Sequence, residues 1–328
     1  MSIEYPKSTH TPWARSQNTV LLAFAIALFS SAMLMFGIQP LFAKFVLPRL
    51  GGSSAVWSVA LVFFQGVLVL GYAYAHLLTR LATPRIAAII HTTVMIAAMA
   101  CLPIAYPAGW TEVPTTNVSL WVLSLFAVGV GFPAFAISAN APLLQSWFSR
   151  TGHKHSADPY FLYGASNIGS FIGLMAYPFV LEPTFELHNQ SNVWSIGFIL
   201  LAAMIGVCGF IVAKLHNPKA EADISQASST IAAEAVTWRD RLIWMGLAMV
   251  PSGLLVGVTA YITTDLASAP FLWIIPLAAF LATFVITFQR EPVIPHDLIR
   301  QIHKLVVAPL VAVMIVMMVG GVWGLALH

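Results

Sequence analysis

Residues 29–78 read FSSAMLMFGIQPLFAKFVLPRLGGSSAVWSVALVFFQGVLVLGYAYAHLL, and this stretch decides the fold. It covers most of two apolar runs, 19–42 and 55–78, which are joined by a short basic and Gly-rich connection. At about 1.5 Å of helix per residue, each run is long enough to cross a hydrocarbon layer of about 30 Å. We therefore predict a pair of membrane-spanning helices, and the rest of the chain repeats this pattern.

The composition indicates the same class of protein. Of the 328 residues, 59% are hydrophobic and only 8% are charged, whereas soluble domains carry about 25% charged residues. So few charges cannot cover the surface of a soluble protein of this length. The apolar runs are continuous rather than alternating, which favours helices over a β-barrel. The predicted fold class is an all-α, polytopic helical membrane protein.

Apolar runs recur along the whole chain, and each is interpreted as a transmembrane helix. The nine runs are 19–42, 55–78, 86–105, 119–141, 159–181, 193–213, 242–262, 269–288 and 305–327. The first is too long for the apolar part of a signal peptide, and no small-residue cleavage site ends it, so we expect it to be retained. Residues 1–18 then form a polar N-terminal segment.

The basic residues of the connections predict the orientation. With the N-terminus inside, the outer connections hold only Lys44 and Arg49. The inner segments hold all the other basic residues: Lys7, Arg15, Arg80, Arg85, Arg150, Lys154, Lys214, Lys219, Arg239, Arg241, Arg290, Arg300 and Lys304. Since Lys and Arg concentrate in the cytoplasmic loops of multi-pass proteins, we predict a cytoplasmic N-terminus in a bacterial-type inner membrane.

The longest inner connection, 214–241, is polar and rich in Ala, Ser and acidic residues, which predicts a cytoplasmic linker. It separates a six-helix half at 19–213 from three further helices within 242–328. Six helices followed by a long inner linker is the layout of major-facilitator-type transporters, whose halves are parallel repeats. On this hypothesis the chain is part of a longer, twelve-helix protein; a complete protein of nine helices is the alternative.

Polar side chains inside the apolar runs are candidates for function, because they are costly in a membrane. Gln39 precedes Pro40 near the outer end of the first run, where a broken helix could build a substrate site and a packed kink is the structural alternative. Gln65 lies in the middle of the second run, where its amide requires a partner. We predict that both line a substrate pathway.

Two asparagines complete the predicted pathway. Asn140 stands at the inner end of the fourth run, and Asn167 lies within the fifth. Hydrogen bonds between membrane helices contribute about 0.6 kcal/mol on average, so a structural role competes with a place in the pathway. Gly169 and Gly173 of the fifth run form a GxxxG spacing, which predicts close helix packing.

Lys44 and Arg49 are basic residues in an outer connection, against the charge rule. They either reach toward lipid headgroups or pair with Glu182 and Asp265, which the predicted topology places at similar depth, at the outer ends of the fifth and seventh runs. From these four residues we predict an outer gate made of ion pairs.

Other chemistry has little support in the sequence. His76 and His91, toward the inner ends of the second and third runs, are either proton acceptors or packed side chains. There is no P-loop, dinucleotide fingerprint, Cys/His metal spacing or basic aromatic patch. We expect no catalytic residue, metal site, cofactor or nucleic-acid partner. The expected partners are the lipid bilayer and a small polar or cationic solute, and the oligomeric state is left open.

Three blocks resemble a known family. Residues 30–78 carry Gln39, Arg49, Gly51, Gly52, Ser53, Gln65, Gly66 and Gly71. Residues 158–183, DPYFLYGASNIGSFIGLMAYPFVLEP, carry Tyr163, Ala165, Asn167, Gly169 and Pro183. Residues 249–288, MVPSGLLVGVTAYITTDLASAPFLWIIPLAAFLATFVITF, carry Thr263, Thr264, Asp265 and Trp273. Together they resemble the membrane domain of fused major-facilitator/spermidine-synthase-like proteins over most of residues 20–290.

The resemblance implies a second hypothesis. In that family a soluble aminopropyltransferase- or methyltransferase-like domain usually follows the membrane part and binds decarboxylated S-adenosylmethionine or a relative. These 328 residues contain no such domain, so transferase activity would require a further C-terminal domain. The open functions are a transporter, the membrane domain of a spermidine-synthase-like protein without its catalytic domain, and a structural subunit with a sealed bundle.

Overall fold

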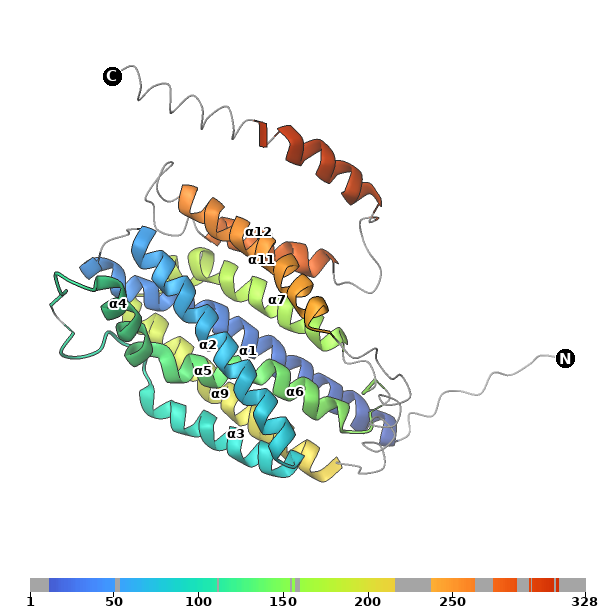
Figure 1. Cartoon of the computed structure of the whole chain (residues 1–328). Coiled ribbons are helices and arrows are strands. Elements are labelled where there is room, and N and C mark those ends of the chain that lie inside the picture. Colours follow the sequence, from blue (N-terminus) through green and yellow to red (C-terminus); the bar gives the residue numbers. More distant parts are fainter. Residues whose placement is uncertain are drawn as a thin grey trace, which may run out of the picture. The chain divides into compact units, whose positions relative to one another are not determined.

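The computed structural model of the chain describes residues 12–50, 54–110, 112–153, 155–156, 160–215, 237–262, 274–287, 295, 297–309 and 311–312. Over these ranges the chain forms helices and short connections, without a strand (Figure 1). Seven helical segments among them are long and apolar enough to cross a membrane. The prediction of an all-α, polytopic membrane protein is confirmed.

The spanning segments follow the chain in order. The first three are α1 (Pro12–Leu50), α2 (Ser54–Leu81) and α3 (Pro84–Ala98), which a short helical turn extends to Cys101. The fourth joins α4 (Val118–Phe126), a wider π-helical turn at Ala127–Gly131, α5 (Phe132–Ser138) and α6 (Asn140–Ser149). The fifth joins α7 (Tyr160–Ala176), a second π-helical turn at Tyr177–Leu181 and α8 (Glu182–Thr184). The sixth and seventh are α9 (Leu187–Leu215) and α11 (Trp238–Tyr261), after which comes the shorter α12 (Ile274–Thr287).

Each of the seven spanning segments overlaps one of the first seven predicted runs, and the first and fourth segments extend eight residues beyond the predicted ends of their runs. The eighth run contains α12, and most of the ninth run, 305–327, lies outside the described residues. So does most of the predicted linker, at 216–236. By its internal contacts the chain divides into two compact units, Met1–Leu281 and Ala282–His328. The second unit contains a described helix at 297–309.

Helix α1 is longer than its apolar run. It continues through Pro40 and Pro48 to Leu50, so the broken helix considered after Gln39 does not form. A proline removes one helical hydrogen bond, but the helix can persist when packing holds both sides of the proline. Ile38 and Leu41 are buried on either side of Pro40. Lys44 and Arg49 therefore lie on the last turns of α1 and not in a connection, which corrects their predicted placement.

Helices α1 and α7 pack closely against one another. A Cβ atom added at Gly169 of α7 would lie 2.3 Å from the carbonyl oxygen of Phe29, and one added at Gly173 would lie 2.3 Å from that of Met33. Only glycine allows the two backbones to approach so closely. The close packing predicted from the GxxxG spacing is confirmed.

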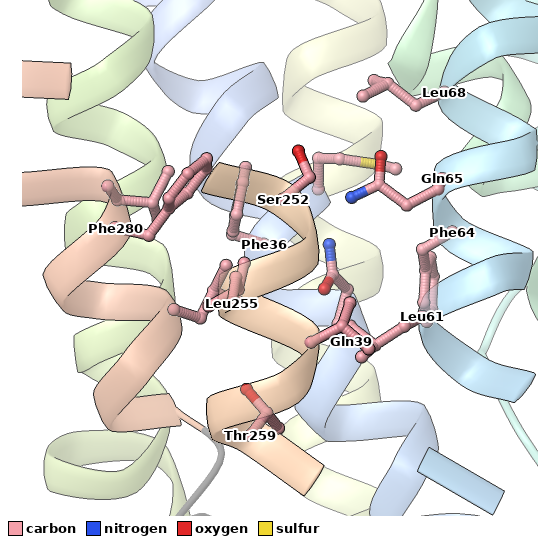
Figure 2. A pocket seen from close by; sticks show the side chains of 14 residues that line it. Phe36, Gln39, Leu61, Phe64, Gln65, Leu68, Ser252, Leu255, Thr259 and Phe280 are labelled. Carbon is pink, nitrogen blue, oxygen red and sulfur yellow. The ribbon is translucent and has the colours of Figure 1, made fainter. Parts of the chain in front are cut away.

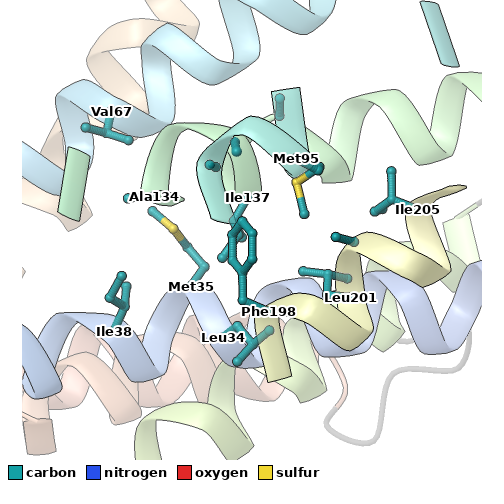
Figure 3. Packing of buried hydrophobic residues seen from close by; sticks show 14 of the residues in the cluster. Leu34, Met35, Ile38, Val67, Met95, Ala134, Ile137, Phe198, Leu201 and Ile205 are labelled. Atoms are coloured by element: carbon teal, nitrogen blue, oxygen red, sulfur yellow. The ribbon is translucent and has the colours of Figure 1, made fainter. Parts of the chain in front are cut away.

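The apolar core fills the space between α1 and the helices around it. Figure 3 shows the ring of Phe198 from α9 pointing toward Ile137 of α5, with Leu34 of α1 beside it. The indole Nε1 of Trp194, one turn earlier on α9, donates a hydrogen bond to the Leu34 carbonyl at 3.0 Å. These contacts fix α9 against the middle of α1, the part of the helix that leads to Gln39.

Candidate functional site

A pocket of about 490 Å³ opens among α1, α2, α11 and α12. The described residues that line it all belong to the unit Met1–Leu281. Four of them are polar, three are phenylalanines and the others are aliphatic or Met; the polar side chains are Gln39, Gln65, Ser252 and Thr259. Ligand pockets commonly have volumes of about 300–1,000 Å³ and a mostly apolar lining with a few polar groups, as here.

Each helix contributes one stripe of side chains to this pocket. On α2 the lining residues are 61, 64, 65 and 68, and on α11 they are 252, 255, 256 and 259. Residues three and four positions apart lie on the same face of a helix. The pocket is therefore formed where the inner stripes of four helices face one another.

The two glutamine amides come from different helices and meet in this space. Figure 2 shows the side chains of Gln39 from α1 and Gln65 from α2 pointing toward one another, with Ser252 of α11 opposite them. Gln39 is half-buried and Gln65 is exposed to the open pocket. In the described part of the chain neither amide has a hydrogen-bond partner, so each can offer a donor and an acceptor to a small molecule.

Asn140 lies elsewhere. We predicted that it stands at the inner end of the fourth span. It begins α6, which continues to Ser149, so it lies inside that span. Asn140 and Pro142 marked the end of the predicted span, but the helix continues through both. The Asn140 side chain is fully buried, hydrogen-bonded to His91 and Ser31, and does not line the pocket.

Asn167 also lies outside the described lining of the pocket. It is buried on α7, two residues before Gly169. Its amide nitrogen has no hydrogen-bond partner among the described residues. Of the four predicted pathway residues, the structure brings together Gln39 and Gln65, and it separates both asparagines from them.

The predicted gate residues are partly assembled. Lys44 of α1 forms an ion pair with Glu182, the first residue of α8, and the two side chains are 29% and 27% exposed. Arg49 stacks over the ring of Tyr106, with 3.8 Å between the guanidinium carbon and the ring centre. Asp265 lies outside the described residues. The four-residue gate remains a prediction, of which the structure contains one ion pair.

Ser252 and Thr259 also line the pocket, although they were not among the predicted pathway residues. They are seven positions apart on the seventh run, which is two helical turns, so both lie on one face. That spacing was visible in the sequence, but single hydroxyls are common in membrane helices and do not stand out. Over the described ranges, no group of three or more His, Cys, Asp or Glu side chains could hold a metal ion.

Comparison with the models of known protein families, with curated proteins and with solved structures gives no match.

Proposed function

We propose that the chain is a transporter-type membrane protein of the major-facilitator kind, with its N-terminus in the cytoplasm, and that the pocket is part of the pathway of a small polar or cationic solute. The main support is the pair of amides, Gln39 and Gln65, that point into an otherwise apolar space. Unpaired amides are costly in an apolar medium unless water or a solute satisfies them.

The lining suggests the class of solute. Amide and hydroxyl oxygens accept hydrogen bonds from the N–H and O–H groups of a solute. The rings of Phe36, Phe64 and Phe280 also border the pocket, and aromatic faces attract cations. Among the described residues that line it, none is charged. A cation would therefore be held by oxygens and ring faces, which favours a weakly hydrated organic amine over a metal ion.

The Lys44–Glu182 ion pair gives this proposal an outer closure. Lys44 lies five positions after Gln39 on α1, so the pair connects a pocket-lining helix to the end of the fifth span. Alternating access requires contacts that form on one side of the membrane and break when the site opens to that side. A partly exposed ion pair such as Lys44–Glu182 can form and break in this way.

A second candidate is the membrane domain of a spermidine-synthase-like protein whose catalytic domain is absent here. The three sequence blocks favour it, since the residues that carry the resemblance include Gln39, Gln65 and Gly169. In that case the bundle anchors or regulates an enzyme, and the pocket need not bind a solute that crosses the membrane.

Thermal unfolding of the detergent-purified protein distinguishes the two candidates. A ligand at about ten times its Kd stabilises the folded state by about 1.4 kcal/mol, so weak ligands are detectable at high concentration. We would test polyamines, amino acids and nucleosides. The transporter proposal expects one class to raise the melting temperature, and expects Gln39→Leu and Gln65→Leu to abolish the rise.

The matched control is Asn189→Leu, which also replaces an amide by leucine, at an exposed position of α9 outside the pocket lining. This variant should keep the rise. A rise that survives both pocket variants would exclude this pocket as the binding site. The absence of a rise with any class would favour the second candidate.

A further inference from the structure

A second cavity lies between α3 and α9 and shares no residue with the pocket described above. It is an open groove of about 410 Å³. The two helices lie side by side (Figure 1), and each contributes one stripe at helical spacing, 85, 88, 89, 92 and 93 from α3 and 206, 209, 210 and 213 from α9.

The floor of the groove is made of small residues. A Cβ atom added at Gly209 would lie 3.0 Å from the Cβ of Ala88, so the helices are in close contact there. One added at Gly206 would have only the methyl group of Thr92 nearby, at 3.7 Å, so space remains above this glycine. Ile89 and Phe210 border the groove and are 68% and 67% exposed. The result is a shallow apolar channel that opens to the surroundings of the bundle.

A fixed positive charge stands at one end of this channel. The Nε of Arg85 donates a hydrogen bond to the carbonyl oxygen of Ala213 at 2.9 Å. That carbonyl belongs to the last turn of α9, where helical carbonyls lack a partner within their own helix. The bond holds the guanidinium at the mouth of the groove. Its two terminal nitrogens have no hydrogen-bond partner in the described part of the chain.

The surroundings of this charge favour an anion. Lys214, next to Ala213, adds a second basic residue at the same end of α9. Neither segment 80–101 nor segment 195–215 contains Asp or Glu. The sequence predicts this end of both helices to be cytoplasmic, the side on which basic sites between membrane helices bind anionic lipid headgroups.

We propose that the groove binds an anionic phospholipid, with its phosphate on the guanidinium of Arg85 and an acyl chain along the channel over Gly206. A planar guanidinium with two free nitrogens matches the geometry of a phosphate. The apolar channel identifies the rest of the ligand, because a free phosphate would leave that surface uncovered. This assignment is independent of the proposed solute pathway.

Native mass spectrometry of the delipidated full chain tests the assignment. Phosphatidylglycerol, phosphatidylcholine and inorganic phosphate are titrated separately. We expect phosphatidylglycerol to bind about fivefold or more tightly than phosphatidylcholine, the preference that one basic residue supplies. Arg85→Gln should remove this preference, and Gly206→Leu, which fills the channel, should weaken the binding of both lipids.

Two matched variants control for position. Arg80→Gln removes a charge at the same end of the bundle outside the groove, and Ala203→Leu enlarges an exposed residue of α9 outside the groove lining. Both should bind phosphatidylglycerol as the unmodified chain does. Arg85→Gln keeps an amide donor for the Ala213 carbonyl, so it decides the question if Gly206→Leu does not fold.

Three results would overturn the proposal. Equal affinity for the two lipids would remove the role of the charge. Equal losses in Arg80→Gln and Arg85→Gln would indicate general surface electrostatics. Binding of inorganic phosphate that Arg85→Gln abolishes, together with lipid binding that Gly206→Leu leaves unchanged, would assign the site to a free anion.

Discussion

The Nε2 atom of His91 lies 2.7 Å from the Oδ1 atom of Asn140, and both side chains are 0% exposed. The amide nitrogen of Asn140 donates to the hydroxyl of Ser31 at 3.0 Å. This bond orients the amide so that its oxygen faces the imidazole, and the Nε2–H group of His91 donates a hydrogen bond to that oxygen. The network joins α1, α3 and α6 inside the bundle.

We expect Asn140→Leu to destabilise the protein by about 1–3 kcal/mol, because it leaves the buried Nε2–H of His91 without an acceptor. The double variant His91→Leu/Asn140→Leu also removes the unpaired donor, so it should cost less than the sum of the two single changes by at least about 0.6 kcal/mol, the average for such bonds in membranes. Unfolding in mixed micelles measures all three variants. Strictly additive losses would mean that the two side chains do not interact.

The contact between α7 and α1 leaves no room for a side chain at Gly173, whereas Gly164 on the same helix is unobstructed and serves as the control. At Gly173 a methyl group would meet the Met33 carbonyl, so we expect Gly173→Ala to destabilise the protein by about 1–3 kcal/mol through overpacking. At Gly164, on the same helix, an added Cβ meets nothing within 4 Å. Gly164→Ala should therefore be neutral or stabilising by up to about 1 kcal/mol, the gain in helix propensity.

Thermal melting of both glycine variants measures the difference. Equal effects at positions 164 and 173 would show that the tight approach of α7 to α1 is not present in the membrane protein.

The spanning helices were predictable from the sequence because the length and continuity of an apolar run follow directly from the thickness of a membrane. The contact through Gly169 and Gly173 was predictable because glycines four positions apart lie on one face of a helix and allow another membrane helix to approach closely. The continuation of α1 past Pro40 was not predictable, because it depends on packing around Ile38 and Leu41 that only the assembled bundle supplies.

The candidate site was predictable in part. Gln39 and Gln65 stand out because an amide within an apolar run is rare, and both line the pocket. Asn140 has the same signal but lies in a different network, because the partners of a side chain depend on how each helix is rotated about its axis. An apolar run with a weak amphipathic pattern does not encode that rotation. The groove at Arg85 was not predicted, because a basic residue at the end of an apolar run is explained by the orientation of the chain in the membrane and does not by itself indicate a binding site.

Tyr106 predicts a loss of stability at alkaline pH. It lies in the connection after α3, where its hydroxyl donates to the Trp110 carbonyl at 2.8 Å. Burial raises the pKa of Tyr106 above its ordinary value of 10.0, and the charge of Arg49 partly opposes this. Because the pKa of Tyr106 is higher in the folded state than in the unfolded state, the neutral hydroxyl stabilises the folded state. This contribution is complete below pH 10.0 and is lost as the pH rises through the folded-state pKa.

The test compares melting temperatures of the unmodified chain and Tyr106→Phe as the pH is raised. The variant should be less stable at neutral pH, because it lacks the bond to Trp110, and the difference should shrink above pH 10.0. A difference that is constant with pH would contradict the assignment of the alkaline loss to this hydroxyl.

We expect the Lys44–Glu182 ion pair to control access to the pocket. Partly exposed ion pairs contribute up to about 1 kcal/mol to stability, so breaking this one should leave the fold intact. If the pair holds an outer closure, Glu182→Gln should instead increase the exposure of the pocket. In a chain with Cys101 and Cys208 replaced by Ala, a cysteine introduced by Met35→Cys reports this exposure, because Met35 lines the pocket one turn before Gln39.

We expect Glu182→Gln to accelerate the reaction of that cysteine with a membrane-impermeant thiol reagent, and the charge exchange Lys44→Glu/Glu182→Lys to restore the slow rate. Glu186→Gln, at an exposed position four residues further along the chain, is the matched control and should change nothing. An unchanged labelling rate in Glu182→Gln, with a melting temperature lowered as in Lys44→Met, would make the pair a structural contact. The solute pathway would then have to be closed by residues other than Lys44 and Glu182.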